Sequence, residues 1–326
     1  MKNTILLFFV ILLFNCSSDD SNNNIESSEW SVDLNDVSGR LNLFPLSLDP
    51  EFLSVSNTDL SDGVIVGVVS FGSAIRVFPY VFVRPTEIIN TSYSNVDYAF
   101  SYCPITKSGI AFKRDQIFRA SGYLYKDNLM PWDESTESIW SQMLGKGVNG
   151  ARQNEILEKI PVLQTTWKTV RTYYPTARVL SRNSTSKLYR FPQEPNDDND
   201  DNVELPFAGE LTYGIVENNL QTVHFFRYQD FESSKRKDVI IQGQKYIVYG
   251  NATKRVVNAF KVSDFDSFQL LDDAEFPKIL KSNNVKYDIL GNSTGGASLN
   301  KPNFAYVAAW FAWSDIFVGY KFYPNQ

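Results

Sequence analysis

Short apolar runs separated by turn residues dominate the chain from Val64 onward. In sequence order the runs are VIVGVVSF, AIRVFPYVFV, DYAFSYCPI and GIAFKR, with Gly, Pro, Asn or Ser between them. Runs of this length that are rich in Val, Ile, Phe and Tyr are typical of β-strands. The pattern therefore predicts a body built mainly of strands.

Helical spacing of apolar residues occurs in two short segments. The two apolar stripes are formed by Trp167, Val170 and Tyr174 in TTWKTVRTYYP and by Tyr306, Trp310, Trp313 and Phe317 in AYVAAWFAWSDIF. Either Thr165 or Thr166 is a suitable N-cap for the first helix, and Pro175 ends it. We expect two short helices whose tryptophans pack in the core. The predicted fold class is α+β, with strands predominant.

The chain also resembles itself. VGVVSFGSAIRVFPY is similar to YGIVENNLQTVHFFR, and GIAFK is similar to VNAFK further along. The offset between the first two segments places Cys103 against Gly250. Such self-similarity is typical of a duplicated unit. We expect one β-rich copy over residues 40–190 and a second, diverged copy over residues 205–326, each ending in a short Trp-bearing helix.

An acidic segment, residues 191–204, separates the two expected copies. Its carboxylate and Asn oxygens are the kind of ligand that calcium prefers, but the Gly and the terminal Glu of an EF-hand loop are missing. A polar segment that is bounded by prolines is typical of a solvated linker. We therefore expect a linker here.

The first fifteen residues differ from the body. Lys2 precedes an apolar run from Ile5 to Phe14. This run is too short to cross a bilayer core of about 30 Å as a helix, because such a helix needs about 20 residues. Residues 1–15 therefore read as a signal peptide.

Cys16 lies directly after this apolar run and before the polar sequence SSDDSNNN. The segment LLFNC resembles a lipobox, in the form found in lipoproteins of Bacteroidetes-type bacteria, where the cysteine carries the lipid. The alternative is an ordinary cleaved signal followed by an incidental cysteine. With lipidation at Cys16, residues 16–30 would form a flexible tether, because they contain almost no apolar side chains.

The acidic SDD behind Cys16 resembles the signal that sends some of these lipoproteins to the cell surface. The expected location is the cell envelope, at the outer membrane, on its periplasmic or its surface face. The membrane is then one partner, held through the lipid on Cys16. A further ligand or protein partner in the envelope is expected but not identified.

Composition narrows the chemistry. The chain has two cysteines, so lipidation of Cys16 leaves Cys103 without an intrachain disulfide partner. His224 is the only histidine, so the chain has few of the ligands that a Cys/His zinc cluster needs. The formal net charge of -6 argues against binding to nucleic acid, which requires a basic surface. The sequence assigns no cofactor and no metal.

Four motifs carry a family resemblance. In order they are YCPITKSGIAF, SGYLYKDNLMPWDESTESIWSQMLGKGV, TTWKTVRTYYPTARVLS and AAWFAW. Together they resemble the bacterial family of unknown function numbered 3179 (DUF3179), from about residue 64 to the C-terminus. The family has no established activity, but its usual motif is YCPLC, and some members look like selenoproteins at such a cysteine. The resemblance thus implies redox or metal chemistry near this motif.

Two departures weaken that implication. Tyr102, Cys103 and Pro104 match the family motif, but Thr106 stands where the second cysteine is usual. The family often has Trp-His-Glu upstream, whereas this chain has Pro-Thr-Glu ending at Glu87. A dithiol couple needs both sulfurs, and a soft metal site needs several Cys or His ligands.

A single reactive thiol remains possible on the sequence alone. The catalytic candidates are Cys103, Glu87 and Asp127, with Lys107 and Arg114 as cations that lower the pKa of the thiol. The alternative is that Cys103 is a small buried apolar residue on a strand.

Polar and aromatic residues alternate in the second motif, and a binding site is expected there. The candidate binding residues are Tyr102, Lys107, Tyr125, Asn128, Trp132, Asp133, Trp140, Ser141 and Gln142. Asp127 and Asp133 form a possible carboxylate pair for acid–base work, or they cap turns. Trp132 and Trp140, in what reads as a polar loop region, are candidates for a ligand-stacking surface or for the core.

These observations favour a membrane-anchored binding or accessory protein of the cell envelope. One alternative is a thiol-dependent redox or metal-linked enzyme that uses Cys103. The other is a surface glycan-binding protein that uses the exposed aromatic residues.

Overall fold

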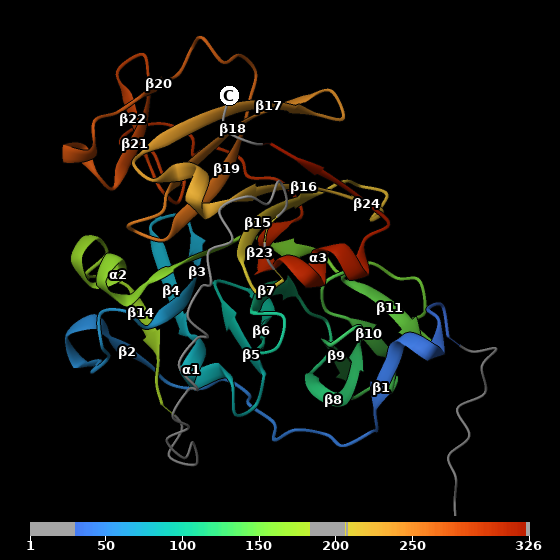
Figure 1. The fold of residues 1–326 in the computed structure, drawn as a ribbon. Coiled ribbons are helices and arrows are strands. Elements are labelled where there is room, and N and C mark those ends of the chain that lie inside the picture. The colour runs from blue at the N-terminus through green and yellow to red at the C-terminus, as the bar shows by residue number, and fades with distance from the viewer. Residues whose placement is uncertain (1–29, 183–205, 207, 324–326) are drawn as a thin grey trace, which may run out of the picture.

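The structure, a computed structural model, describes residues 30–182, 206 and 208–323 (Figure 1). Strands predominate, and the helices of these ranges are short. This confirms the mainly β body that the apolar runs predict. The expected signal peptide, the expected lipidation site Cys16 and the expected linker 191–204 lie outside the described residues. Within the described ranges, no helix has the length and apolar character needed to span a membrane.

The first half of the chain contributes the sheets that we call I, II and III. Sheet I has the strand order β13-β3-β4-β14-β2, sheet II the order β12-β7-β6-β5, and sheet III the order β1-β8-β9-β10-β11. The strands of sheet I are β2 (Phe52–Ser54), β3 (Ile65–Phe71), β4 (Ala74–Pro79), β13 (Val162–Thr166) and β14 (Arg178–Leu180). Those of sheet II are β5 (Ile88–Tyr93), β6 (Val96–Cys103), β7 (Ser108–Lys113) and β12 (Lys159–Ile160). Those of sheet III are β1 (Val37–Gly39), β8 (Phe118–Tyr125), β9 (Asn128–Asp133), β10 (Ile139–Ser141) and β11 (Lys146–Asn149).

The second half contributes sheets IV, V and VI. Sheet IV has the order β23-β15-β16-β24, and sheets V and VI are the meanders β17-β18-β19 and β20-β21-β22. The strands of sheet IV are β15 (Leu211–Val216), β16 (Thr222–Arg227), β23 (Ala305–Ala309) and β24 (Gly319–Phe322). Those of sheets V and VI are β17 (Lys235–Ile241), β18 (Gln244–Asn251), β19 (Val256–Val262), β20 (Gln269–Leu270), β21 (Lys278–Ser282) and β22 (Val285–Asp288).

The helical segments are short, and they join the strands. The α-helices are α1 (Tyr80–Val83), α2 (Trp167–Tyr173) and α3 (Trp310–Ile316), and the 3-10 helices are η2 (Leu34–Asp36), η3 (Val55–Asn57), η4 (Tyr228–Phe231) and η5 (Asp273–Glu275). The expected N-cap of the first Trp-bearing helix is Thr166, whose side chain accepts a hydrogen bond from the Thr169 N–H. Trp167, Trp310 and Trp313 are all buried, so their expected place in the core is confirmed.

Sheets I and IV are arranged alike. In sheet I the hairpin β3–β4 has β13 antiparallel to β3 and β14 parallel to β4. In sheet IV the hairpin β15–β16 has β23 antiparallel to β15 and β24 parallel to β16. In each sheet the short helix α2 or α3 follows the outer antiparallel strand directly and leads to the parallel strand on the other side.

A glycine occupies the same place in both hairpins. Gly67 lies opposite Phe78 on β4, and Gly214 lies opposite Phe225 on β16. A Cβ atom at Gly67 would overlap the ring of Phe100, and one at Gly214 would lie 2.7 Å from ring atoms of Trp313. Both glycines therefore let a large aromatic ring pack closely over the sheet.

The two halves are packed against each other in a reciprocal way (Figure 1). In each half, the strand that directly precedes the Trp-bearing helix packs on a hairpin of the other half. Strand β23 packs on β7, and β13 packs on β19. The Ala309 N–H, at the start of α3, donates a hydrogen bond of 2.9 Å to the carbonyl oxygen of Thr106. The Thr165 hydroxyl, before α2, donates one of 3.0 Å to the carbonyl oxygen of Lys254.

Shared cores strengthen this connection. Trp140 of the first half and Trp313 of the second lie in one cluster of buried apolar side chains. Trp167 of the first half shares another cluster with Ile247 and Phe260 of the second. The turn between β6 and β7, which carries Cys103, therefore lies where the two halves meet.

The segment that read as a polar loop region forms strands instead. Strands β8, β9 and β10 cover most of residues 118–141, and the register of β8 against β9 shifts between Ala120 and Leu124. Many polar side chains here are buried, which is why a pattern of apolar and polar residues does not mark the strands.

Candidate functional site

Cys103 ends β6 and begins a tight turn to β7, residues 103–108, which we call the Cys103 turn. Its side chain is 1% exposed. The sulfur lies 3.6 Å from the carbonyl oxygen of Asp127, in the turn between β8 and β9. Burial raises the pKa of the Cys103 thiol, although the Thr106 hydroxyl and the N–H groups of Thr106 and Leu129 act in the opposite direction. The thiol is therefore protonated and enclosed at neutral pH.

Glu87 and Asp127, the other catalytic candidates, each contact this part of the chain through a backbone oxygen. The Tyr102 N–H donates to the carbonyl oxygen of Glu87 at 2.9 Å. Burial raises the pKa of the Glu87 carboxyl to about 7, and the charge of Glu87 raises the pKa of Cys103 further. Asp127 is exposed, and the atom that contacts the sulfur is its backbone oxygen. The three candidates are thus brought together, but the contacts do not activate the thiol.

The expected cations do not meet the sulfur. Lys107 belongs to the turn, but its ammonium group reaches the carbonyl oxygen of Gly209 at 3.5 Å. Arg114 lies just past the far end of β7 from Cys103, and its guanidinium contacts the carbonyl oxygen of Gln116 at 3.5 Å. The suggestion that Arg114 assists Cys103 is wrong, because the length of β7 separates them.

A network of buried amides and hydroxyls lies beside the Cys103 turn. We call it the amide network; it consists of Ser101, Thr106, Ser108, Asn128 and Gln142, all almost fully buried. The Asn128 side-chain amide donates to Gln142 Oε1 at 2.7 Å and to Thr106 Oγ1 at 3.0 Å. The Ser108 hydroxyl donates to Gln142 Oε1 at 2.9 Å, and Gln142 Nε2 donates to Ser101 Oγ at 2.9 Å. Because its members satisfy one another, this network fixes the turn against β9 and β10.

The hairpin β18–β19 has an asparagine at the place of Cys103. Asn251 ends β18 as Cys103 ends β6, and turns of equal length follow. Asn251 Oδ1 accepts from the Lys254 N–H at 3.0 Å, as the sulfur of Cys103 accepts from the N–H three residues later. The expected pairing of Cys103 with Gly250 is therefore wrong by one residue. The register of the two hairpins gives the reason, since Phe100 faces Ala111 and Val248 faces Ala259.

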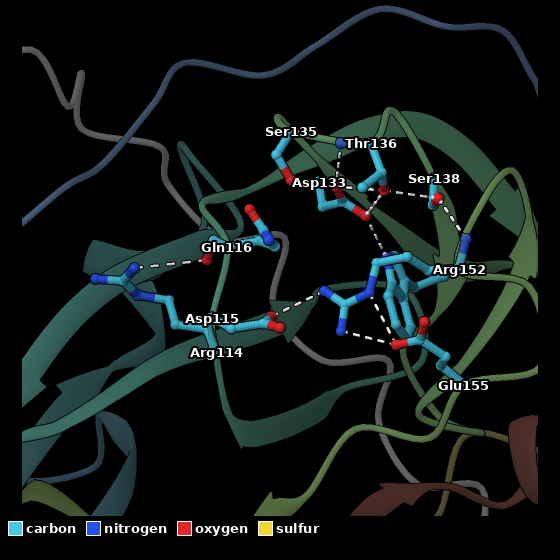
Figure 2. A network of polar contacts seen from close by, with 10 residues as sticks. Arg114, Asp115, Gln116, Asp133, Ser135, Thr136, Ser138, Arg152 and Glu155 are labelled. Carbon is cyan, nitrogen blue, oxygen red and sulfur yellow. Dashed lines mark hydrogen bonds and ion pairs between the residues drawn. The ribbon is translucent and has the colours of Figure 1, made fainter.

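Asp133 organises the loop between β9 and β10, which Figure 2 shows. Its carboxylate accepts from the Thr136 N–H at 2.8 Å and from the Trp140 indole N–H at 3.0 Å. The Arg152 guanidinium binds Asp115 at 2.8 Å (Figure 2). It also lies 5.0 Å from the Trp140 ring centroid. Asp133 thus caps a turn, which is one of the two roles that its sequence context allows.

The carboxylate pair and the surface role of Trp140 are wrong. Asp127 and Asp133 lie at opposite ends of β9, about 20 Å apart at roughly 3.3 Å per strand residue. That separation exceeds any pair that can act on one glycosidic bond. Trp140 is 0% exposed and cannot stack on a surface ligand, whereas Trp132 is partly exposed.

The remaining binding candidates are inside the body. Tyr102 is buried and stacks on Tyr80 with ring centroids 4.1 Å apart. Tyr125 is buried in the same core as Trp140, and Ser141 is fully buried with its hydroxyl accepting from the Leu144 N–H at 3.4 Å. These residues shape the body around Cys103 and offer no open binding surface.

A cavity of about 460 Å³ lies between the halves, and we call it the interhalf cavity. The residues that line it lie in segments 144–161, 217–220 and 301–304, and they include Lys159, Lys301 and Phe304. Nζ of Lys159 is buried and has no hydrogen-bond partner among the described residues. Burial lowers the pKa of Lys159 to about 7 and that of Lys301 to about 8.

The comparison with known families decides the relationship of this chain. The family described as a protein of unknown function (DUF3179) matches residues 42–326. The chain belongs to this family. The match includes all four motifs of the resemblance and begins before the residue 64 expected from them. No curated protein and no solved structure matches the chain.

Three of the four DUF3179 motifs meet at the Cys103 turn. The first contains the turn itself, the second supplies Asn128 and Gln142, and the fourth supplies the Ala309 N–H that binds Thr106 O. The third motif, which contains α2, packs at the turn between β18 and β19, where the Thr165 hydroxyl donates to the carbonyl oxygen of Lys254. In this DUF3179 chain Thr106, in the place of the usual second cysteine, is a member of the amide network.

Sequence reasoning missed the hydroxyls of the network and the lysine of the cavity. In the sequence Thr106 is recognisable only as a departure from the motif, and Ser101 and Ser108 carry no local signal. Lys159 follows Glu158 and precedes Ile160 in the sequence LEKI, and it begins a short strand. This pattern of two charged residues gives no signal that one of them is buried. Among the residues that the structure describes, no group of three or more His, Cys, Asp or Glu side chains is placed to hold a metal ion.

Proposed function

We propose that this DUF3179 protein is a membrane-anchored lipoprotein of the cell envelope whose body binds a ligand and performs no reaction at Cys103. The enclosure of Cys103 is the observation that carries the proposal. A reactive thiol needs exposure and a lowered pKa, whereas Cys103 is 1% exposed and burial raises its pKa. The volume of the interhalf cavity, about 460 Å³, supports a small-molecule ligand, because it falls in the range of known small-molecule sites.

Maleimide labelling of the purified lipoprotein tests the role of Cys103. Lipidation consumes Cys16, so Cys103 is the only remaining thiol. The matched control carries Ile105→Cys in a Cys103→Ala background, because Ile105 is on the same turn and 46% exposed. We expect Cys103 in the native protein to react at least about 100-fold more slowly than the introduced thiol of the control, since labelling of Cys103 requires local opening. Equal rates near neutral pH contradict the proposal.

Membrane anchoring is tested separately at Cys16. Cells that express the wild-type chain and the Cys16→Ser variant are grown with radiolabelled palmitate and fractionated. We expect label and membrane recovery for the wild type and neither for the variant, because two or three acyl chains hold a protein stably at a membrane. A wild-type chain that is released without label contradicts the anchor. Protease treatment of intact cells then distinguishes the surface face from the periplasmic face.

We also infer that the body arose by duplication of one β-rich unit. The shared arrangement of sheets I and IV supports this, as do the matching glycines Gly67 and Gly214. The reciprocal contacts support it as well: the carbonyl of Thr106 binds the start of α3, and that of Lys254 binds the residues around the start of α2. The binding cavity then lies between two related copies.

A thiol-dependent enzyme is the second candidate, and one observation favours it. The N–H groups of Thr106 and Leu129 and the Thr106 hydroxyl are directed at the sulfur and would stabilise a thiolate. Rapid native labelling of Cys103 would favour this candidate over the binding protein.

A further inference from the structure

Lys159 lies in the interhalf cavity without a carboxylate or a hydrogen-bond acceptor among the described residues. Its Nζ is shielded from solvent and donates to no hydrogen-bond acceptor in the described part of the chain. It lies 4.5 Å from the centroid of the Phe304 ring. A Cβ atom at Gly145 would overlap Nζ, so a glycine is needed to leave room for the ammonium group. An ammonium group in such surroundings loses much of its hydration. Burial of a charge without a compensating partner is costly in free energy.

The other charged groups of the cavity do not supply this partner. Glu158 is paired with Lys113, and Glu217 accepts from His224 at 2.7 Å and from Gln242 at 3.2 Å. The ammonium group of Lys301, the second lysine of the cavity, donates to the Ser70 hydroxyl at 3.4 Å, and the charge of Asp288 opposes the effect of burial on its pKa. Within the described ranges, neither Lys159 nor Lys301 forms an ion pair, and Lys159 has no nearby carboxylate that raises its pKa.

The rest of the lining is mainly apolar. Leu144, Leu157, Leu220, Pro302 and Phe304 all face this space. Apolar walls bind a hydrocarbon or aromatic body, and a fixed cation binds an anionic head. A highly hydrated inorganic anion gains little from such walls. An organic acid with an apolar body fits both features.

We propose that the interhalf cavity binds a small organic carboxylate, whose carboxylate pairs with the ammonium group of Lys159 and whose apolar body packs between Leu157 and Phe304. The inference rests on the proposed binding function and names the chemical class of its ligand. The flexible four-carbon stem of lysine allows Nζ to turn toward a carboxylate that enters the cavity. Lys301 adds a second positive charge at the same cavity.

Benzoate and benzamide, titrated into the full chain by calorimetry, test the proposal. They have the same shape, but only benzoate is charged. We expect benzoate to bind at least about tenfold more tightly than benzamide, because a charge-assisted hydrogen bond is worth more than a neutral one. Lys159→Met should reduce benzoate affinity by about tenfold or more and leave benzamide affinity unchanged. Lys168→Met, an exposed position on α2, is the matched control and should change neither affinity.

The pH dependence gives a readout that a merely structural role of Lys159 would not produce. Benzoate affinity should fall as pH rises from 6 to 8.5, because Lys159 and Lys301 lose their protons in this range while benzoate stays ionised. In Lys159→Met the fall should be smaller. We expect the variant to fold, since methionine replaces a buried cation that has no hydrogen-bond acceptor among the described residues with an apolar side chain of similar length. A thermal melt checks this.

Three results overturn the inference: benzamide binds as tightly as benzoate, Lys159→Met binds benzoate as the wild type does, or neither probe binds. None of them alters the labelling rate of Cys103, on which the proposed function is judged. Slow labelling together with any of these results removes the carboxylate ligand and leaves the binding protein. Fast labelling removes the proposed function itself.

Discussion

Among single residues, Thr106 determines whether the Cys103 turn can form a dithiol couple. In the usual family motif a second cysteine stands at this position, and a dithiol couple is possible there. Here the Thr106 hydroxyl accepts from Asn128 and is within 2.9 Å of the Ser108 hydroxyl. The replacement therefore turns a potential redox pair into one thiol held by a polar network. The motif alone indicates this loss, but Asn128, which donates to Thr106, comes from β9 and was not predictable.

The amide network should depend strongly on Asn128. Asn128→Ala removes the donor to Thr106 and Gln142 and the acceptor for the Met143 N–H. We expect the free energy of unfolding to fall by about 3 kcal/mol, because buried polar atoms lose their partners. Urea denaturation measures this change. Asn57→Ala, at an exposed position, is the control and should change the free energy by less than about 0.5 kcal/mol.

Glu87 should make stability depend on pH. Burial raises its pKa to about 7, so between its ordinary value of about 4.3 and 7 the folded chain holds a proton that the unfolded chain has lost. The free energy of unfolding should therefore fall as pH rises from 5 to 8, by on the order of 2 kcal/mol. Urea titrations at both pH values should show a smaller fall in Glu87→Gln than in Glu51→Gln, an exposed control. An equal fall in the two variants contradicts the assignment.

Among the secondary-structure elements, those helices and hairpins were predictable in which the local sequence pattern agrees with the burial of the side chains. The stripe containing Trp167 and Val170 predicts α2, and VIVGVVSF and AIRVFPYVFV contain β3 and β4. Strands β8 to β10 were not recognised, because Asn128, Ser141 and other polar side chains on them are buried by partners from distant strands. Local patterns cannot reveal such partners.

The N-cap of α2 should contribute measurably to stability. The Thr166 hydroxyl accepts from the Thr169 N–H, and α2 starts directly after β13. Thr166→Ala should lower the free energy of unfolding by about 1 kcal/mol, since an N–H of the first turn loses its acceptor. Thr253→Ala, at an exposed position, serves as the control in the same thermal or urea melt. Equal stability of the two variants would show that the cap contributes nothing.

Interlocking of the halves produces the candidate site at the scale of the whole molecule. Self-similarity indicated two units, but it did not indicate that β23 packs on β7 and β13 on β19. The interhalf cavity is formed by segments 144–161, 217–220 and 301–304, which are distant in sequence. The sequence did not predict a role for Lys159, because the lack of a nearby carboxylate is a property of the folded chain.

The central claim is that the ligand site is the interhalf cavity, where Lys159 lies, and not the Cys103 turn. The most direct test is an NMR titration of the full chain with ¹³C-labelled lysine side chains, in which the signal missing from Lys159→Met identifies Lys159. The account predicts a titration midpoint near pH 7 that rises when benzoate is added. A midpoint near the ordinary lysine value of about 10.4, or one that benzoate leaves unchanged, would contradict it.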